Sequence, residues 1–431
     1  MEVRTSSVYV ANGLIVLAKA PAMLKSFVPV FPQRFIATEE TMFRRWEENG
    51  NPWERKAATF DLDASEMTYF REYFKSRPKF SERDNNATLD DISKEAALKA
   101  NPSVVALECF IEGKETIRGC GIIIESNLNK CIVLTSANLI RRPTLDKDVK
   151  NVIPNDLKVY MYSFDNRSSC AEEVCAYDFH LNLAVLRFRT TTCFEPATLA
   201  HVKDPKNVTS RPFLRPHLRS SSTTPGDQVV AIGRYFTWPF ELMAAPGCYL
   251  LRQTNYDCKE LFTTSCVITR CGDGCPMVNA RGEVIGVAYY DFNLTHCMPI
   301  NIAWKWWQRC KQFGECRLPS LGIEGTYLLR ARLGLLERII VKFPHVSKGV
   351  LVEKVISGSC ADLAGICDDD IIIQCAGKSV EGFLEFYETL MDHVGSFIEL
   401  VVIRTNSVIP IQLKMEVVEV APDQINSWPN R

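Results

Sequence analysis

The sequence predicts a mainly β protein built from more than one compact unit. From Val104 onward, short runs rich in β-branched residues alternate with turn residues, which is typical of an all-β barrel or sandwich and not of a parallel α/β sheet. A length of 431 residues allows two or three domains at roughly 100–200 residues each. The predicted strands of the first β unit are Val104–Ile111, Gly121–Glu125, Cys131–Thr135, Leu157–Tyr162, Leu183–Phe188, Gln228–Ile232 and Glu283–Tyr289.

The composition is that of an ordinary globular protein. Hydrophobic residues make up 46% and charged residues 23% of the chain, which excludes disorder, collagen-like repeats and coiled coil as the overall class. The formal net charge of −1 gives no electrostatic reason to expect a nucleic-acid partner. No uninterrupted apolar stretch reaches about 18 residues, so we expect no membrane-spanning helix.

The 17 cysteines predict neither a disulfide scaffold nor a metal site. There is no CxxC pair, and Cys271-Gly-Asp-Gly-Cys275 has the wrong spacing for a zinc knuckle or a thioredoxin-type site. We therefore expect reduced, packed thiols in an intracellular compartment, and no cofactor.

The N-terminal region, residues 1–87, is predicted to be a mixed, partly helical extension. It has no acidic residue between Glu2 and Glu39, and its apolar run Leu14–Ala18 is too short for a secretory signal. Residues 1–36 are compatible with a mitochondrial or plastid targeting segment, and equally with a plain extension.

The rest of the chain divides into two units. Residues 88–313 begin with a helix over Ile92–Ala100, for which we expect Thr88 as the N-cap, and end with a helix over Ile300–Phe313. Residues 314–319 form a linker, 320–420 a second compact unit and 421–431 a tail. The second unit is predicted to contain strands at Gly349–Val355, Asp370–Gln374, Ile398–Arg404 and Ile409–Met415, with a helix over Glu381–Met391.

Several motifs resemble, in order, those of the HtrA/Deg (Do-like) serine proteases, and the likeness is greatest to divergent plant members. Leu134–Asn138 reads L-T-S-A-N and resembles the family's L-T-x-A-H, while Asn182–Leu186 reads N-L-A-V-L and resembles D-L-A-V-L. Further matches are Pro102–Val105, Pro225–Gly233, Gly274–Val287, Ser320–Ile323, Lys348–Val352, Gly358–Ser359, Ala364–Gly365 and Gly377–Lys378. The resemblance implies a trypsin-like double β-barrel followed by a PDZ domain, and it leaves residues 1–87 uncovered.

The family's chemistry requires a serine nucleophile, a histidine base and an aspartate that orients the histidine. Asn138 stands where the histidine belongs, and its amide nitrogen has no lone pair available to take a proton. Asn182 stands where the aspartate belongs. The nucleophile loop is one residue short relative to G-[ND]-S-G-G-P, so that either Asp273 takes the serine position or the serine is deleted. We therefore expect no working catalytic residues.

Two other readings of the nucleophile loop stay open. Cys271 and Cys275 flank the serine position and would need a base. His180 lies two residues before Asn182, and the other histidines are His201, His217, His296, His345 and His393. A cysteine–histidine pair is one interpretation; packed thiols and a loop histidine are the ordinary one.

The second unit is expected to keep its binding site. In the family, a peptide C-terminus adds as a strand to the PDZ edge, and backbone N–H groups hold its carboxylate. The matching loop residues are Leu321, Gly322 and Ile323.

The sequence thus favours a pseudoprotease that binds peptide C-termini or unfolded proteins as a chaperone, scaffold or regulator. By resemblance, a homotrimer or a mixed trimer with active relatives is expected. The alternative is a serine-type endopeptidase, which the resemblance alone implies.

Overall fold

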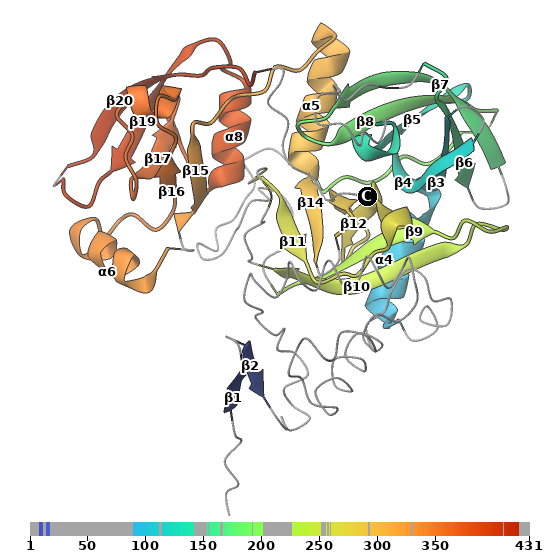
Figure 1. The fold of residues 1–431 in the computed structure, drawn as a ribbon, viewed down its shortest axis with the longest axis horizontal. Coiled ribbons are helices and arrows are strands. Elements are labelled where there is room, and N and C mark those ends of the chain that lie inside the picture. Colours follow the sequence, from blue (N-terminus) through green and yellow to red (C-terminus); the bar gives the residue numbers. More distant parts are fainter. Residues whose placement is uncertain are drawn as a thin grey trace, which may run out of the picture. The chain divides into compact units, whose positions relative to one another are not determined.

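The computed structural model describes residues 8–11, 14–17, 89–111, 114–141, 153, 155–163, 167–191, 193–200, 226–250, 256, 258, 260–291, 294–328, 331–407 and 409–421 (Figure 1). The chain divides into two compact units, residues 1–77 and 78–431. In the first unit, β1 (Val8–Ala11) and β2 (Leu14–Leu17) form an antiparallel pair. The remainder of the predicted extension 1–87, with the rest of the predicted targeting segment 1–36, lies outside the described residues.

The second unit begins with helix α4 (Asp91–Ala100), followed by a short 3-10 turn, η3 (Asn101–Ser103). We expected Thr88 to be the N-cap, and this expectation is wrong: Asp90 caps the helix. Its carboxylate accepts hydrogen bonds from both the backbone N–H (2.9 Å) and the hydroxyl (2.8 Å) of Ser93. A charged acceptor beside the positive end of a helix is a stronger cap than a threonine hydroxyl placed further upstream.

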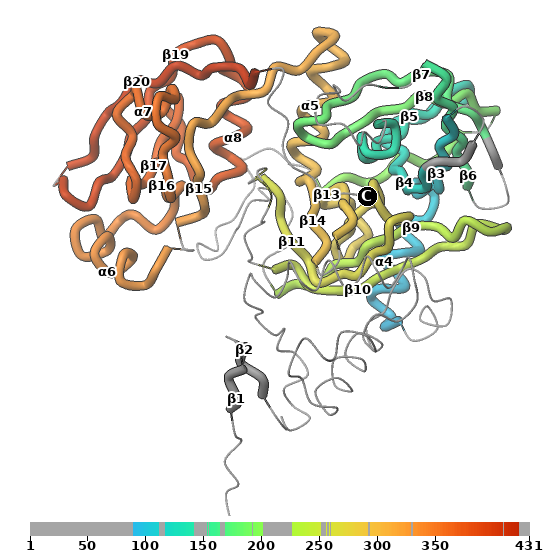
Figure 2. The backbone as a smooth tube through the Cα atoms, in the orientation of Figure 1, coloured from blue at the N-terminus to red at the C-terminus, as the bar shows by residue number. Residues whose placement is uncertain are grey.

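Two closed six-stranded barrels follow, and they confirm the expected mainly β, trypsin-like double barrel (Figures 1 and 2). The first, in the order β3-β4-β5-β8-β7-β6, contains β3 (Val104–Ile111), β4 (Lys114–Ser126), β5 (Lys130–Ser136), β6 (Lys158–Ser163), β7 (Arg167–Asp178) and β8 (Leu183–Arg189). The second, in the order β10-β11-β14-β13-β12-β9, contains β9 (Gln228–Arg234), β10 (Leu242–Leu250), β11 (Phe262–Thr264), β12 (Pro276–Asn279), β13 (Val284–Tyr289) and β14 (Thr295–Pro299).

Strand β5 is buried on both faces because the two barrels share a core. Cys131 and Val133 belong to the core inside the first barrel. Ile132 and Leu134 belong to a different core, which continues into the second barrel. Successive side chains of a strand point to opposite faces, so a strand between two cores becomes an uninterrupted apolar run.

Arg234 fastens the start of the first barrel to the second barrel. It ends β9, yet its Nε donates to the Val104 carbonyl (2.5 Å) and its Nη2 to the Asn101 carbonyl (2.9 Å) and side chain (2.7 Å). Its Nη1 donates to the Phe240 carbonyl at 2.8 Å. Burial lowers the pKa of Arg234 to about 10, and the guanidinium is kept in place by these four acceptors.

Helix α5 (Ile300–Phe313), predicted with these bounds, closes the second barrel and leads into a C-terminal sheet. This sheet has the order β15-β16-β17-β19-β20, with β18 paired to β17, and is consistent with the predicted PDZ domain. Its elements are β15 (Ile323–Tyr327), α6 (Leu333–Lys342), β16 (Val350–Val355), α7 (Cys360–Leu363), β17 (Ile371–Cys375), β18 (Lys378–Ser379), α8 (Phe383–Met391), β19 (Phe397–Ile403) and β20 (Ile411–Glu416). Within the described part of the chain, no helix has both the length and the apolar character needed to span a bilayer.

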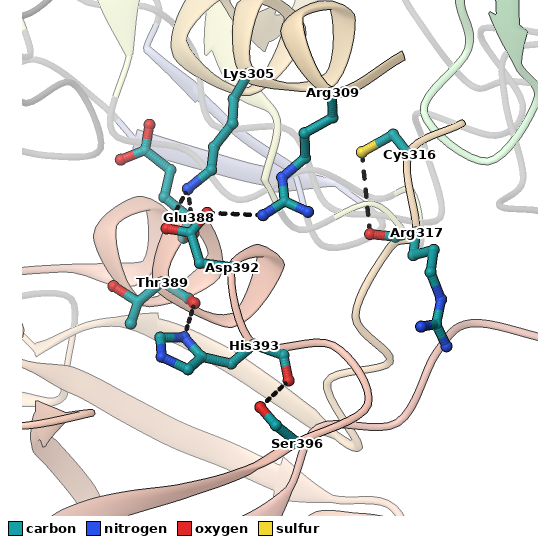
Figure 3. A network of polar contacts seen from close by, with 9 residues as sticks. All are labelled: Lys305, Arg309, Cys316, Arg317, Glu388, Thr389, Asp392, His393 and Ser396. Atoms are coloured by element: carbon teal, nitrogen blue, oxygen red, sulfur yellow. Dashed lines mark hydrogen bonds and ion pairs between the residues drawn. The ribbon is translucent and has the colours of Figure 1, made fainter. Parts of the chain in front are cut away.

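Helices α5 and α8 contact each other through an ion-pair network (Figure 3). Lys305 donates to the Asp392 carboxylate at 2.8 Å and to the Glu388 carbonyl at 2.6 Å, and Arg309 donates to the same carboxylate at 2.9 Å. Beside this network, the α8 side chains of Leu384, Tyr387 and Met391 are buried in the core shared by the barrels. Charged and apolar contacts together join the sheet domain to the second barrel.

Candidate functional site

The three residues that the sequence analysis expects at the catalytic positions, Asn138, Asn182 and Asp273, meet where the two barrels join. Asn138 lies in a 3-10 turn, η4 (Ala137–Leu139), directly after β5, and Asn182 directly precedes β8. The pairing of Ser136 with Leu183 brings these two turns together. Asp273 comes from the second barrel, and its carbonyl accepts from the N–H of Cys120 on β4 at 2.9 Å.

Asn138 links a cation to a carboxylate. Its Nδ2 donates to Asp273 Oδ2 at 3.3 Å, and its Oδ1 accepts from Arg141 Nη2 at 2.7 Å. Because Arg141 can only donate, it fixes the amide with the oxygen toward the guanidinium and the nitrogen toward Asp273. The sequence analysis did not identify Arg141; its position three residues after Asn138 in a helical turn was the available signal.

Asn182 orients the turn that carries Asn138. Its Oδ1 accepts from the Asn138 backbone N–H (3.0 Å) and from the Ser136 hydroxyl (3.3 Å), and its carbonyl accepts from the Ala137 N–H (3.1 Å). Its backbone is left-handed, with φ of +54°, a conformation that asparagine tolerates better than most residues. Its Nδ2 is buried and has no hydrogen-bond partner among the described residues.

Asp273 is only 2% exposed, and its carboxylate is held from two sides. Besides the Asn138 amide, Oδ1 accepts from the Tyr290 backbone N–H at 3.2 Å. The residue follows a 3-10 turn, η7 (Arg270–Gly272), of the nucleophile loop. This arrangement is a closed polar contact across the barrel junction.

The backbone N–H groups of the nucleophile loop point at protein carbonyls. Asp273 N–H donates to the Arg270 carbonyl at 3.2 Å, and Cys275 N–H donates to the Gly272 carbonyl at 3.0 Å. Gly274 N–H donates to the Ala288 carbonyl at 2.8 Å. An oxyanion hole needs N–H groups aimed at the developing charge of the substrate, so these three donors do not supply one in this conformation.

Gly274 is required by the packing of this loop. Its φ is +82°, and a Cβ there would lie 2.4 Å from Thr135 Oγ1 and 2.5 Å from the Cys120 carbonyl oxygen. Either contact is far inside van der Waals distance, so only glycine fits between the loop and the first barrel.

The two cysteines of the loop are poorly suited to act as nucleophiles. Cys275 is fully buried, and burial, reinforced by the neighbouring thiols of Cys120, Cys297 and Cys266, raises its pKa well above the ordinary value. Burial also raises the pKa of Cys271, whose sulfur lies 2.9 Å from Thr269 Oγ1. Only the thiolate attacks, and neither environment favours it at neutral pH.

Three histidines have polar contacts with residues outside the nucleophile loop. The backbone N–H of His180, the candidate base for a cysteine, donates to Asp178 Oδ1 at 2.8 Å. His296 Nε2 lies 3.0 Å from Asp291 Oδ2, and His393 Nδ1 lies 2.8 Å from the Thr389 carbonyl oxygen. Within the described residues, no group of three or more histidine, cysteine or acidic side chains is placed to hold a metal ion.

The predicted peptide-binding loop precedes strand β15. Gly322 has φ of +65°, and its carbonyl accepts from the Ile356 N–H (2.9 Å) and from the Ser359 hydroxyl (3.1 Å). Ile323 starts the strand opposite Val355. Among the described residues, no backbone carbonyl accepts a hydrogen bond from the N–H groups of Leu321 and Gly322. Two donors at the entry of an edge strand are suited to a carboxylate.

Comparisons with known proteins find similarity to trypsin-like peptidases. Residues 119–287 match the family model described as "Trypsin-like peptidase domain". The Arabidopsis thaliana protein "Putative protease Do-like 14" is 30% identical over 216 residues, which are 48% of this chain and 48% of that protein. The Rattus norvegicus "Serine protease HTR4" is 26% identical over 349 residues, which are 74% of this chain and 62% of that protein. The matched parts of this chain thus span 48% and 62% of the length of these two relatives.

Solved structures are similar at lower identity. "HtrA-type protease AlgW with tripeptide" superposes with a TM-score of 0.49 at 18% sequence identity, over 77% of this chain and 98% of that one. "Crystal structure of the serine endoprotease from Yersinia pestis" superposes with a TM-score of 0.42 at 19% identity, over 77% of this chain and 100% of that one.

Proposed function

Because this chain is a homologue of the HtrA/Deg trypsin-like serine proteases, we propose that it is a family member without peptidase activity, which binds peptide C-termini or unfolded chains. The observation that carries the proposal is the hydrogen bond between Asn138 and Asp273, since by resemblance Asn138 stands at the base position and, in one of the two alignments of the loop, Asp273 stands at the nucleophile position. It would serve as a chaperone, a scaffold or a regulator of active relatives, including relatives in a mixed trimer.

The side chains at the three positions do not support acyl transfer. An amide at position 138 cannot take a proton near neutral pH, and Asp273 offers a carboxylate already engaged by Asn138 and Tyr290. Removing a hydrolase triad costs roughly 10⁶-fold in kcat, which turns an enzyme of about 10 events per second into one of about one event per day.

The backbone of the nucleophile loop supports the same conclusion independently. The N–H of Asp273 is bonded to the Arg270 carbonyl, so an arriving substrate carbonyl would have to compete with an existing hydrogen bond. Loss of one oxyanion donor alone costs roughly 10²-fold to 10³-fold in kcat.

The binding half of the proposal rests on the loop of the C-terminal sheet. The N–H groups of Leu321 and Gly322 are available for a carboxylate, and the adjacent strand β15 is an edge of the sheet. Backbone donors do not depend on side-chain identity, so this site tolerates sequence change that would inactivate a triad.

The second candidate function is a serine-type endopeptidase, favoured by the match of residues 119–287 to peptidases. It would require either a rearranged loop or a cysteine nucleophile at position 271 or 275. The buried, high-pKa environment of Cys275 counts against the cysteine route.

Casein degradation and labelling by a fluorophosphonate probe separate the two functions. We expect the purified chain to do neither. The variant Asn138→His/Asn182→Asp/Asp273→Ser rebuilds the three side chains and provides the matched comparison; labelling of this variant alone would show that the missing side chains limit the reaction. The proposal would be overturned if the unmodified chain cleaves casein and either Asp273→Ala or Cys275→Ala abolishes that cleavage.

Peptide binding is tested separately, by fluorescence polarisation with a library of labelled peptides that end in a free apolar C-terminus. We expect binding that amidation of the terminal carboxylate abolishes. Failure of every peptide and of unfolded casein to bind would overturn the binding half.

A further inference from the structure

Strand β4 and the nucleophile loop are in direct contact, and each carries a cysteine at the point of contact. The N–H of Cys120 on β4 donates to the Asp273 carbonyl at 2.9 Å, and the Cys120 thiol donates to the Cys271 carbonyl at 3.2 Å. A Cβ on Gly119 would lie only 3.0 Å from the same Asp273 carbonyl oxygen. The sulfur of Cys120 therefore touches the backbone of the residue that carries the second thiol.

The two thiols differ in their access to solvent. Cys120 is fully buried, whereas Cys271 is only partly buried. Both are free thiols, and the Cys271 sulfur lies 2.9 Å from Thr269 Oγ1. A dissolved oxidant therefore meets Cys271 first, and Cys120 is the thiol that can attack the oxidised Cys271 from inside the protein.

A cation acts on each of the two thiols. Burial raises the pKa of Cys271, while the Thr269 hydroxyl and the charge of Arg118 act in the opposite direction. Burial and the neighbouring Cys271 thiol raise the pKa of Cys120, against the charge of Arg234. Burial prevails at both sites, so the thiolate fraction is small at neutral pH. Thiol exchange here should therefore be slow, and about tenfold faster for each added pH unit.

We propose that Cys120 and Cys271 form a redox-controlled cross-link, which a small disulfide oxidant closes and a small reducing thiol opens. When closed, the bond fixes the nucleophile loop to the first barrel. To form it, the Cys271 sulfur turns from Thr269 toward β4. Cys275 is the competing partner for Cys120, but it is fully buried, so an oxidant does not reach it first.

The reaction consists of two successive thiol–disulfide exchanges with oxidised glutathione. The Cys271 thiolate attacks one sulfur of the oxidant, forms a mixed disulfide and expels one glutathione thiolate. The Cys120 thiolate then attacks the Cys271 sulfur and breaks its bond to the second glutathione, which leaves as a thiolate. The two protons of the protein thiols end on the two glutathiones. The protein thus loses two electrons, and oxidised glutathione gains them.

Incubation of the full chain with oxidised glutathione at pH 8, followed by alkylation and non-reducing peptide mapping, tests for the bond. We expect two peptides joined through Cys120 and Cys271, which dithiothreitol separates. Cys271→Ser should abolish this pair. The matched control, Cys170→Ser, replaces an exposed cysteine of β7 and should leave the yield of the pair unchanged. Oxidation should raise the unfolding temperature of the parent by about 5 °C or more, because the bond closes a long loop of chain. This rise should be absent in Cys271→Ser.

Hydrogen exchange of the loop amides tests whether the bond fixes the loop. The N–H groups of Asp273 and Cys275 donate to carbonyls within the loop, and their exchange should slow severalfold on oxidation. The proposal is overturned if mapping of the parent finds no bond between Cys120 and Cys271, or finds Cys120 joined to Cys275. It is also overturned if either the unfolding temperature or the loop exchange is the same in the oxidised and reduced parent. Since the parent itself is mapped, this result does not depend on the folding of Cys271→Ser.

Discussion

Asn138 and Asp273 are hydrogen-bonded to each other, amide to carboxylate, across 3.3 Å. Arg141 holds the far end of the amide at 2.7 Å, so a cation, a neutral amide and an anion form one chain. The polar groups of Asn138 and Asp273 thus satisfy one another. In an active protease of this fold, both would have to remain available to the substrate.

Asp273→Ala is expected to destabilise the fold without changing any enzymatic readout. It leaves the Asn138 amide and the Tyr290 N–H without an acceptor in a site that is 2% exposed, which costs about 1–3 kcal/mol. Urea denaturation measures this loss. Asp91→Ala, an exposed change in the first turn of α4, is the control and should cost only about 0.3–1 kcal/mol. Equal losses in the two variants would contradict the proposed role of the buried carboxylate.

The thiol of Cys275 is expected to resist alkylation in the folded protein. Burial raises its pKa well above the ordinary value, so iodoacetamide at neutral pH meets almost no thiolate. Peptide mapping by mass spectrometry should show Cys275 modified only after denaturation, while the exposed Cys170, Cys248 and Cys367 react first. Rapid modification of Cys275 in the native state would revive the cysteine-nucleophile interpretation.

Gly322→Ala should abolish peptide binding, and Gly358→Ala should spare it. Both glycines have positive φ, +65° and +77°, so both variants carry a similar backbone penalty. Only at Gly322 would the new Cβ collide, at 2.6 Å from Ser359 Oγ and 2.7 Å from its Cβ. Fluorescence polarisation of a bound peptide measures the difference. Equal affinity in the two variants would place the peptide elsewhere.

Arg404→Met should destabilise the C-terminal sheet strongly. Arg404 makes two 2.7 Å hydrogen bonds to the fully buried carboxylate of Asp370, an arrangement that raises the pKa of the guanidinium further. Removing the partner of a buried charge costs about 3–5 kcal/mol. The control, Arg317→Met, breaks the surface pair with Glu419 and should cost less than about 1 kcal/mol by thermal or urea unfolding. A similar cost for both changes would show that Asp370 finds another partner.

The α5–α8 contact should be weaker in acid, because protonation of the Asp392 carboxylate removes its ion pairs with Lys305 and Arg309. Burial acts to raise the pKa of this carboxyl, but the hydrogen bonds and charges of Lys305 and Arg309 outweigh it, and the net effect is a pKa below the ordinary 3.8. The stabilisation is therefore complete above about pH 5 and disappears as the pH falls through the lowered value. Since the side chain is 48% exposed, the effect should stay below about 1 kcal/mol.

The matched measurement for this contact compares unfolding of Asp392→Asn and the parent chain between pH 3 and pH 7. The parent should be more stable at pH 7, and the two curves should converge near pH 3. A stability difference that grows in acid would have the wrong sign and would contradict the assignment.

The fold class could be predicted from the sequence because many strands are recognisable from their own run of β-branched residues. β-branched runs such as that in β5 and the helix over Ile300–Phe313 were predicted at or near their observed bounds. Strands β7, β10, β11 and β14 were not predicted. β10 carries Pro246 and Gly247, and β14 carries His296 and Pro299, where a strand pattern would have aliphatic residues.

The motifs singled out three residues that the structure brings together, but not the contacts that these residues make. Asn138, Asn182 and Asp273 could be placed by motif, and whether they are catalytically silent stays a prediction. What the sequence could not provide was Arg141 holding the amide of Asn138, or Tyr290 capping Asp273, because such contacts depend on how η4 and β13 approach one another across two barrels. The N-cap error at Thr88 has a similar origin, since Gln228 of β9 also donates to Asp90, at 2.9 Å.

The four hydrogen bonds of Arg234 limit where the chain can be truncated without losing contacts of the second barrel. The turn after helix α4 precedes the first barrel in the chain, yet the carbonyl and side-chain oxygens of its Asn101 accept hydrogen bonds from Arg234 of the second barrel. A shortened protein starting at Val104 would lack Asn101, which provides two of the four acceptors of the buried Arg234 guanidinium. Residues 89–103 therefore have to be retained together with the second barrel in any domain swap, fusion or truncation. Through Arg234, the two barrels and the segment before them form one structural unit that should be kept whole.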